Sequence, residues 1–240
     1  MSTSQDGAAT RRRYHSPARE AAARDTRRRI RDAARRLFVE SGYAATSVRA
    51  VAAAAGVAEK TVYLQFEGKA AILKEVVDAA IVGDEVGVPA VRQQWFLAVA
   101  AEPALGRRAA LLAEGTSALH ERTGPVFAVA REASTVDAEV ATLWGRGKRR
   151  HLADMRTLAV SFDEHGLLPP GRDVDWATDL LYVLLGPESW SLVRRELGRD
   201  APAYREWLEV SLLASFGGTP ETLQRHPDSS MPPGTSPSGS

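Results

Sequence analysis

The chain has 240 residues, of which 44% are hydrophobic and 25% are charged, the proportions of an ordinary globular protein. It contains no cysteine, which excludes a disulfide framework, a thiolate metal site and a cysteine nucleophile. No apolar run reaches the ~18 residues that a membrane-spanning helix needs, and residues 1–10 are polar, unlike a secretory signal. We therefore expect a cytoplasmic protein.

The net charge of +1 conceals a basic N-terminus. The first 36 residues hold eleven arginines against four acidic residues and so carry +7, which leaves −6 for the remainder. Such an asymmetry fits local attraction to a polyanion, and it fits an arginine-rich lead-in without a partner equally well.

The two ends of the chain lack the pattern of a folded segment. Residues 1–24 mix Ser, Gly, Pro and Arg without apolar periodicity and are expected to form a flexible basic arm. Residues 217–240 are rich in Pro, Gly and Ser and are expected to form a disordered tail. Between them nearly every segment has a helical period and none alternates as a strand, so the predicted fold class is all-α.

The first predicted helix covers residues 26–41, and Gly42 ends it. Its apolar residues recur at the spacing of one buried helix face: Ile30, Ala33, Ala34, Leu37 and Phe38. A short helix at 47–54, a tight turn at 55–57 and a third helix at 58–66 follow. Two short helices joined by a glycine-containing turn form a helix-turn-helix, whose second helix enters the DNA major groove.

The remaining predicted helices number six or seven, which gives nine to ten in total. A fourth helix opens near residue 68 and runs to 81. Glycine and proline loops then separate helices at 89–101, 103–122, 125–133, 136–165, 174–197 and 202–216. We predict a three-helix DNA-binding domain over residues 25–70 and a helical bundle over residues 71–216.

Residues 26–73 contain a series of short motifs in one continuous register. They are Ile30, Ala33-Ala34, Leu37-Phe38, Gly42-Tyr43, Thr46-Ser47-Val48, Val51-Ala52, Ala55-Gly56-Val57, Thr61-Val62-Tyr63, and Phe66 with Lys69. This series resembles the DNA-binding domain of the TetR (tetracycline-repressor-like) family. The resemblance implies a homodimeric transcriptional regulator that binds double-stranded operator DNA and responds to a small-molecule effector, most often as a repressor.

The resemblance assigns phosphate contacts to four side chains. Thr46 and Ser47 would bind a phosphate at the positive end of the second helix, while Tyr63 and Lys69 would each bind another. The alternatives are a core aromatic with a solvated hydroxyl for Tyr63 and a solvated amine for Lys69. Arg27 to Arg29, together with Arg11 to Arg13 of the arm, could add phosphate or minor-groove contacts.

Three side chains of the third helix are candidates for reading bases. Lys60 suits guanine O6 and N7, whereas Thr61 and Leu64 suit a thymine methyl. Ala58 stands where the family often has a capping Ser or Thr, so one cap is expected to be missing. Glu59 either accepts from a cytosine amino group or favours the helix dipole.

The rest of the chain shows no catalytic constellation. The five histidines lie far apart without acidic companions at metal-ligand spacing, and no phosphate-binding glycine loop or nucleophile elbow is present. We expect no enzyme activity, no cofactor and no metal. A helical enzyme with an incidental helix-turn-helix is the remote alternative.

The resemblance implies that the C-terminal bundle holds an effector pocket and the dimer contact. The predicted pocket residues are Trp95, His120, Phe127, Arg131 and Trp144. Because this set is mostly apolar and aromatic, it favours a hydrophobic or aromatic effector. The alternative is a regulator without a small-molecule effector, controlled by a protein partner or by its own concentration.

Residues 175–198 and 204–213 are similar to the last two helices of one large branch of the family, which pack against their twofold mates. The predicted interface residues are Leu180, Leu181, Leu184, Leu185, Trp207, Leu208 and Leu212. The alternative is that these side chains are buried within the monomer.

Overall fold

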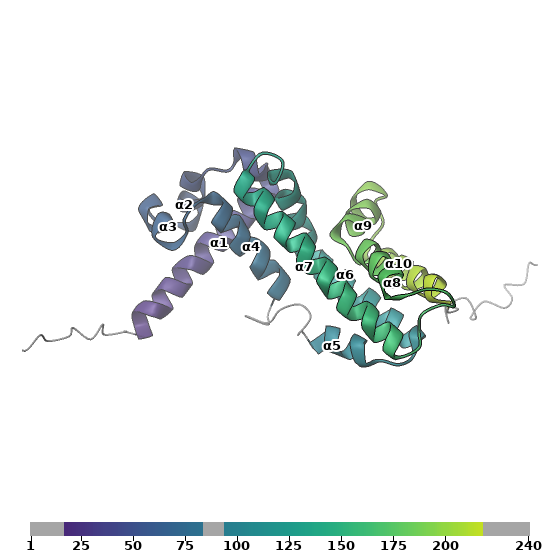
Figure 1. Ribbon diagram of the computed structural model, residues 1–240. Helices are drawn as coiled ribbons and strands as arrows, with labels where there is room; N and C mark the ends of the chain where they lie inside the picture. Colours follow the sequence, from purple (N-terminus) through teal and green to yellow (C-terminus); the bar gives the residue numbers. More distant parts are fainter. Residues whose placement is uncertain (1–16, 84–93, 218–240) are drawn as a thin grey trace, which may run out of the picture. The chain divides into compact units, whose positions relative to one another are not determined.

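The computed structural model describes residues 17–83 and 94–217 (Figure 1). Over these ranges the regular structure consists of α-helices and one π-helical turn, without a strand, which confirms the predicted fold class. The chain divides into two compact units, residues 1–76 and 77–240. The division lies six residues beyond the predicted domain boundary. None of the helices in the described ranges is long and apolar enough to cross a membrane.

The first unit is built from three helices and the start of a fourth. These are α1 (Pro17–Ala45), α2 (Val48–Ala55), α3 (Glu59–Gln65) and α4 (Lys69–Val82). Each helix contributes apolar residues at helical spacing to one core, among them Ile30, Phe38, Val51, Val62 and Ile72. The apolar pattern of the sequence therefore predicts the order and packing of these helices correctly.

Helix α1 begins nine residues earlier than predicted. Pro17 stands at its first position, alanines dominate residues 18–23, and Glu20 lies in the first turn, all of which favour a helix. Residues 18–25 are exposed, so local propensity rather than packing stabilises this extension. Residues 17–24, expected to belong to the flexible arm, are therefore helical.

Single residues determine where α2 begins and ends and where α3 begins. Ser47 caps α2, because its Oγ accepts a hydrogen bond from the Ala50 N–H at 3.1 Å. Gly56 ends α2 with a φ of +65°, which only glycine adopts without strain. Helix α3 starts at Ala58 without a side-chain cap, as the sequence predicts.

The second unit is a helical bundle. Its helices are α5 (Gln94–Ala101), α6 (Leu105–Ala133), α7 (Ala138–Glu164), α8 (Val174–Leu184), α9 (Pro187–Ser191), the π-helical turn η2 (Leu192–Glu196) and α10 (Ala201–Phe216). Helices α6 and α7 run side by side (Figure 1), α8 packs along α7 and α10 packs along α6. The fully buried residues Leu112, Leu158, Leu181 and Leu208 lie in the shared core.

Two predicted helix boundaries in this unit are wrong, in opposite directions. Gly124 and Pro125 were expected to separate two helices, but α6 continues through them. The missing side chain of Gly124 allows the Trp190 indole to pack directly on the α6 backbone, and this contact favours a continuous helix. A single helix was expected over 174–197, but it breaks at Gly186, whose extended backbone precedes Pro187 at the start of α9.

Candidate functional site

One face of α3 presents side chains that the core does not use. Lys60, Tyr63 and Leu64 are exposed, Tyr63 by 54% and Leu64 by 74%, while Val62 on the opposite side is buried. Thr61 is half-buried beside them. Positions i, i+3 and i+4 share a helix face, so the predicted contact residues form one surface. A leucine exposed to this degree contributes little to folding, which suggests a binding role.

The two residues before α2 have different environments. Thr46 is buried, and its Oγ1 donates to the Gly42 carbonyl at 2.8 Å, with the Leu37 carbonyl 3.2 Å away. Its hydroxyl proton therefore holds the end of α1, and the phosphate contact expected of Thr46 stays a prediction. Ser47 is exposed, and its Oγ acts as an acceptor for Ala50, which leaves its proton for a phosphate.

Lys69 begins α4, and its Nζ lies 4.1 Å from the centre of the buried Tyr43 ring. A cation–π contact of this kind holds the ammonium group without neutralising its charge. The structure thus fixes the charge of Lys69 at one place on the domain surface, as a phosphate contact requires.

Arg27 makes contacts within the first unit. Its Nη1 donates to the Gln65 carbonyl and its Nη2 to Glu75 Oε2, both at 2.7 Å, and its guanidinium lies 4.2 Å from the centre of the Phe66 ring. The hydrogen bond to Glu75 raises the pKa of Arg27 and lowers that of Glu75. Both ends of the guanidinium bind protein, and the expected contact of Arg27 with DNA stays a prediction.

The match to known protein families falls on this same region. Residues 30–76 match the family model described as bacterial regulatory proteins of the tetR family. The chain carries a TetR-family DNA-binding domain. The match covers the described helices from within α1 to within α4 and includes the exposed face of α3.

Solved structures of several bacterial regulators share the fold over about four fifths of the chain. FadR of Bacillus subtilis in complex with stearoyl-CoA is 19% identical, over 78% of this chain and 98% of its own, with a TM-score of 0.61. NalD, the secondary repressor of the MexAB-OprM multidrug efflux pump of Pseudomonas aeruginosa, is 22% identical over 81% and 97%, with a TM-score of 0.62. SmeT, the repressor of the Stenotrophomonas maltophilia efflux pump SmeDEF, is 21% identical over 80% and 91%, with a TM-score of 0.56. No curated protein sequence matches the chain.

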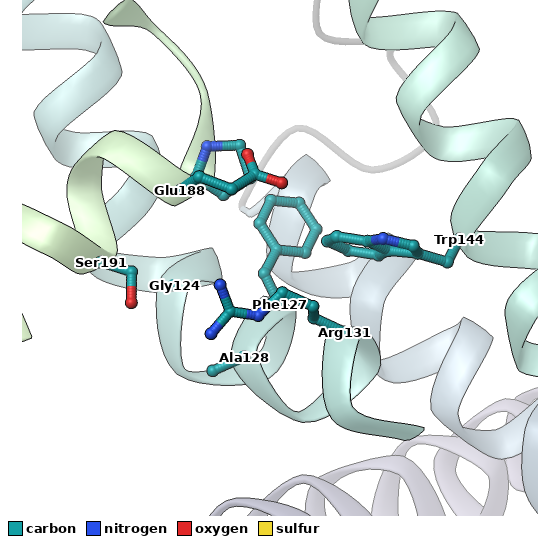
Figure 2. Close-up of a pocket in the computed structure, with 8 residues that line it drawn as sticks. Gly124, Phe127, Ala128, Arg131, Trp144, Glu188 and Ser191 are labelled. Atoms are coloured by element: carbon teal, nitrogen blue, oxygen red, sulfur yellow. The ribbon is translucent and has the colours of Figure 1, made fainter. Parts of the chain in front are cut away.

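Beyond the TetR-family domain, three predicted pocket residues line one hollow. Phe127 and Arg131 of α6 and Trp144 of α7 surround it with Glu188 and Ser191 of α9 (Figure 2). The Phe127 and Trp144 rings meet edge to face, with centres 6.0 Å apart. The hollow has a volume of about 10 Å³, room for about one water molecule. An effector would have to widen it.

The other two predicted pocket residues, His120 and Trp95, do not line this hollow, and their contact with an effector stays a prediction. His120 is buried, and its Nε2 donates to the Leu185 carbonyl at 2.9 Å. Burial lowers the pKa of His120 to about 4, so it is neutral at pH 7. Trp95 packs its indole against the backbone of Gly115, which has no Cβ to obstruct it.

The predicted dimer residues are mostly used by the core of the bundle. Leu181, Leu185, Leu208 and Leu212 are buried in it, and Leu180 and Leu184 are partly buried against it. Helix packing within one chain therefore covers four of these side chains fully and two in part, and their contact with a second chain stays a prediction. Of the predicted set, Trp207 is exposed.

Other apolar residues of the same region are exposed instead. They are Val183 (61%) on α8, Leu192 on η2 and Leu197 (67%) just after η2. The sequence pattern missed them because it treated 174–197 as one helix, and the break at Gly186 changes which positions share a face. Where leucines occupy many neighbouring positions, the sequence does not indicate which of them stay outside the core.

Proposed function

We propose that the chain is a homodimeric transcriptional regulator that represses from a near-palindromic operator and is released by a small hydrophobic or aromatic effector. The observation that carries the proposal is the exposed face of α3. Lys60, Tyr63 and Leu64 lie on the second helix of a helix-turn-helix, which in this class of domain enters the major groove. The TetR-family match over residues 30–76 supports the same assignment.

The contacts divide into those that position the protein and those that read sequence. We assign Ser47, Tyr63 and Lys69 to backbone phosphates, since each offers a hydroxyl proton or a positive charge at the surface. Lys60 is assigned to guanine, and Leu64, with Thr61 beside it, to a thymine methyl. Thr46 acts indirectly in this scheme, because it fixes the start of α2 from the end of α1.

A near-palindromic operator requires two copies of the recognition helix, ~34–36 Å apart or somewhat more. Exposed apolar side chains in this region are Val183 on α8, Leu192 on η2, Leu197 just after η2, and Trp207 on α10, which also stacks on the buried Tyr204 ring. We propose that this surface, rather than the buried leucines, forms the contact between the two chains.

For the effector we propose the hollow lined by Phe127, Arg131 and Trp144. Its aromatic rings suit a flat apolar molecule, and Arg131 suits a polar or anionic group on it. The small volume of the hollow favours a second candidate, a regulator that answers to a protein partner or to its own concentration. Thermal-shift measurements with hydrophobic and aromatic compounds separate the two, because a ligand that binds the folded state raises Tm.

The experiment that tests the main proposal is selection of bound sequences from random duplex DNA, with the stoichiometry read from the selected complex. A two-half-site motif bound by an even number of chains is the expected result. Failure to recover any motif at moderate salt, with or without added compounds, would remove sequence-specific DNA binding from the proposal.

A further inference from the structure

Two arginines of α1 bind the backbone at the end of the recognition helix and just before its start. Arg27 donates to the carbonyl of Gln65, the last residue of α3. Arg29 donates from Nη2 to the carbonyl of Ala55, the last residue of α2, at 2.6 Å and to that of Gly56, in the turn that leads into α3, at 3.3 Å. Residues two apart on a helix project about 200° from one another, so α1 can reach both places at once. We infer that Arg27 and Arg29 are positioning residues that set the orientation of α3 and thereby its sequence preference. This inference rests on the proposed DNA-binding function.

Helix α3 needs such support because little else fixes it. It has seven residues, fewer than the ~12–15 that an isolated helix needs in water. Ala58 provides no side-chain cap, and Val62 is its one fully buried residue. The next buried side chain, Phe66 at its C-cap, is itself covered by the Arg27 guanidinium, so loss of the arginine contacts would let α3 shift and move Lys60 and Leu64 relative to the bases.

The contacts of Arg27 require a guanidinium, and the contact of Arg29, made by Nη2 alone, requires the length of the arginine side chain, because lysine is one bond shorter. Arg27 bonds the Gln65 carbonyl and the Glu75 carboxylate through different nitrogens, and a lysine ammonium is a single compact donor that does not span both. Arg29 comes close to Gly56 because that residue lacks a side chain. A Cβ at Gly56 would lie 3.0 Å from the Arg29 Nη2, so the glycine serves this contact as well as the turn.

Replacement of each arginine by lysine distinguishes a positioning role from phosphate binding. Lysine keeps the positive charge, so a contact with a phosphate would survive the replacement. We expect Arg27→Lys and Arg29→Lys to lower affinity for the selected operator by about tenfold, the size of one lost charge-assisted hydrogen bond. Affinity for an unrelated duplex, and its dependence on salt, should not change. Arg36→Lys, at an exposed arginine of the same helix, is the matched control and should behave as the native chain.

A second variant removes the partner of Arg27 instead. Glu75→Gln deletes a negative charge, which by electrostatics alone strengthens binding to every DNA sequence. If Arg27 positions α3, Glu75→Gln nevertheless weakens binding to the operator relative to the unrelated duplex. An equal gain in affinity for both duplexes in Glu75→Gln, or unchanged operator affinity in the lysine variants, would overturn the inference.

A measurement without DNA keeps this inference distinct from the proposed function. Amide hydrogen exchange over residues 59–65 should be at least several times faster in Arg27→Lys and Arg29→Lys than in the native chain or in Arg36→Lys, at a temperature where circular dichroism shows all four to be folded. Equal exchange rates over 59–65 would overturn the inference. If the native chain selects no operator, the proposed function fails, and the exchange rates still decide whether the arginines hold α3.

Discussion

Lowering the pH from 8 to 5 is expected to destabilise the helical bundle through His120. The folded chain keeps this buried imidazole neutral, with a pKa of about 4, whereas the unfolded chain protonates it near its ordinary pKa of about 6.5. The contribution is therefore fully present above pH 6.5 and is lost as the pH falls toward 4, because only the unfolded state gains the proton. At pH 5 the loss amounts to about 2 kcal/mol of unfolding free energy.

The assay is urea unfolding of the native chain and of His120→Gln at pH 8 and pH 5, at one protein concentration. Tryptophan fluorescence reports this unit, since all five tryptophans lie beyond residue 83. Glutamine cannot titrate, and its amide can still donate to the Leu185 carbonyl, the partner of His120. The contributions of all other titrating groups to the pH dependence are the same in both proteins and cancel in the difference. If both lose equal stability between pH 8 and pH 5, His120 is not protonated on unfolding and the reasoning fails.

Three further predictions concern packing, assembly and base reading. Gly124→Ala would drive a Cβ into the Trp190 ring and should lower the free energy of unfolding by about 1–3 kcal/mol. The control Gly147→Ala, whose Cβ meets nothing within 4 Å, should raise this free energy by about 1 kcal/mol. If urea unfolding shows that both variants change the free energy of unfolding in the same direction, the proposed packing of Trp190 on Gly124 is wrong. Val183→Glu should shift the chain from dimer to monomer in sedimentation without lowering Tm, and an unchanged dimer would place the contact elsewhere. Lys60→Ala should cost about 1–3 kcal/mol at the operator and relax one base pair in each half-site, and an unchanged selected motif would remove it from the base-reading residues.

The sequence alone predicts the first unit well, because local signals determine it. Apolar spacing gives the core of α1, and Gly56 fixes the turn before α3. The same periodicity predicts which side chains of α3 are exposed, because they lie on the face opposite the buried Val62. The charge pattern, in contrast, does not predict that Arg27 pairs with Glu75, because the two lie 48 residues apart and no local pattern joins them.

The second unit shows where local signals fail. Glycine followed by proline occurs at 124–125 and at 186–187, and only the second pair breaks a helix. The difference is tertiary, because Trp190 packs on Gly124. Leu208 is buried and Leu197 is exposed because of the helices that pack around each of them, and the local sequence does not reveal that packing. Helix existence was predictable here, whereas helix boundaries and the burial of single leucines were not.

The continuity of α6 through Pro125 has a consequence for how the bundle opens. Proline has no amide proton, so the carbonyl of Glu121 lacks its partner in the helical ladder. The large apolar cluster of the bundle takes its α6 members from the part of the helix that ends at Ala113, while Val126 and Ala133 are buried outside that cluster. We therefore expect the two halves of this one helix to open separately, so that α6 exchanges its amide protons as two blocks divided near residue 121.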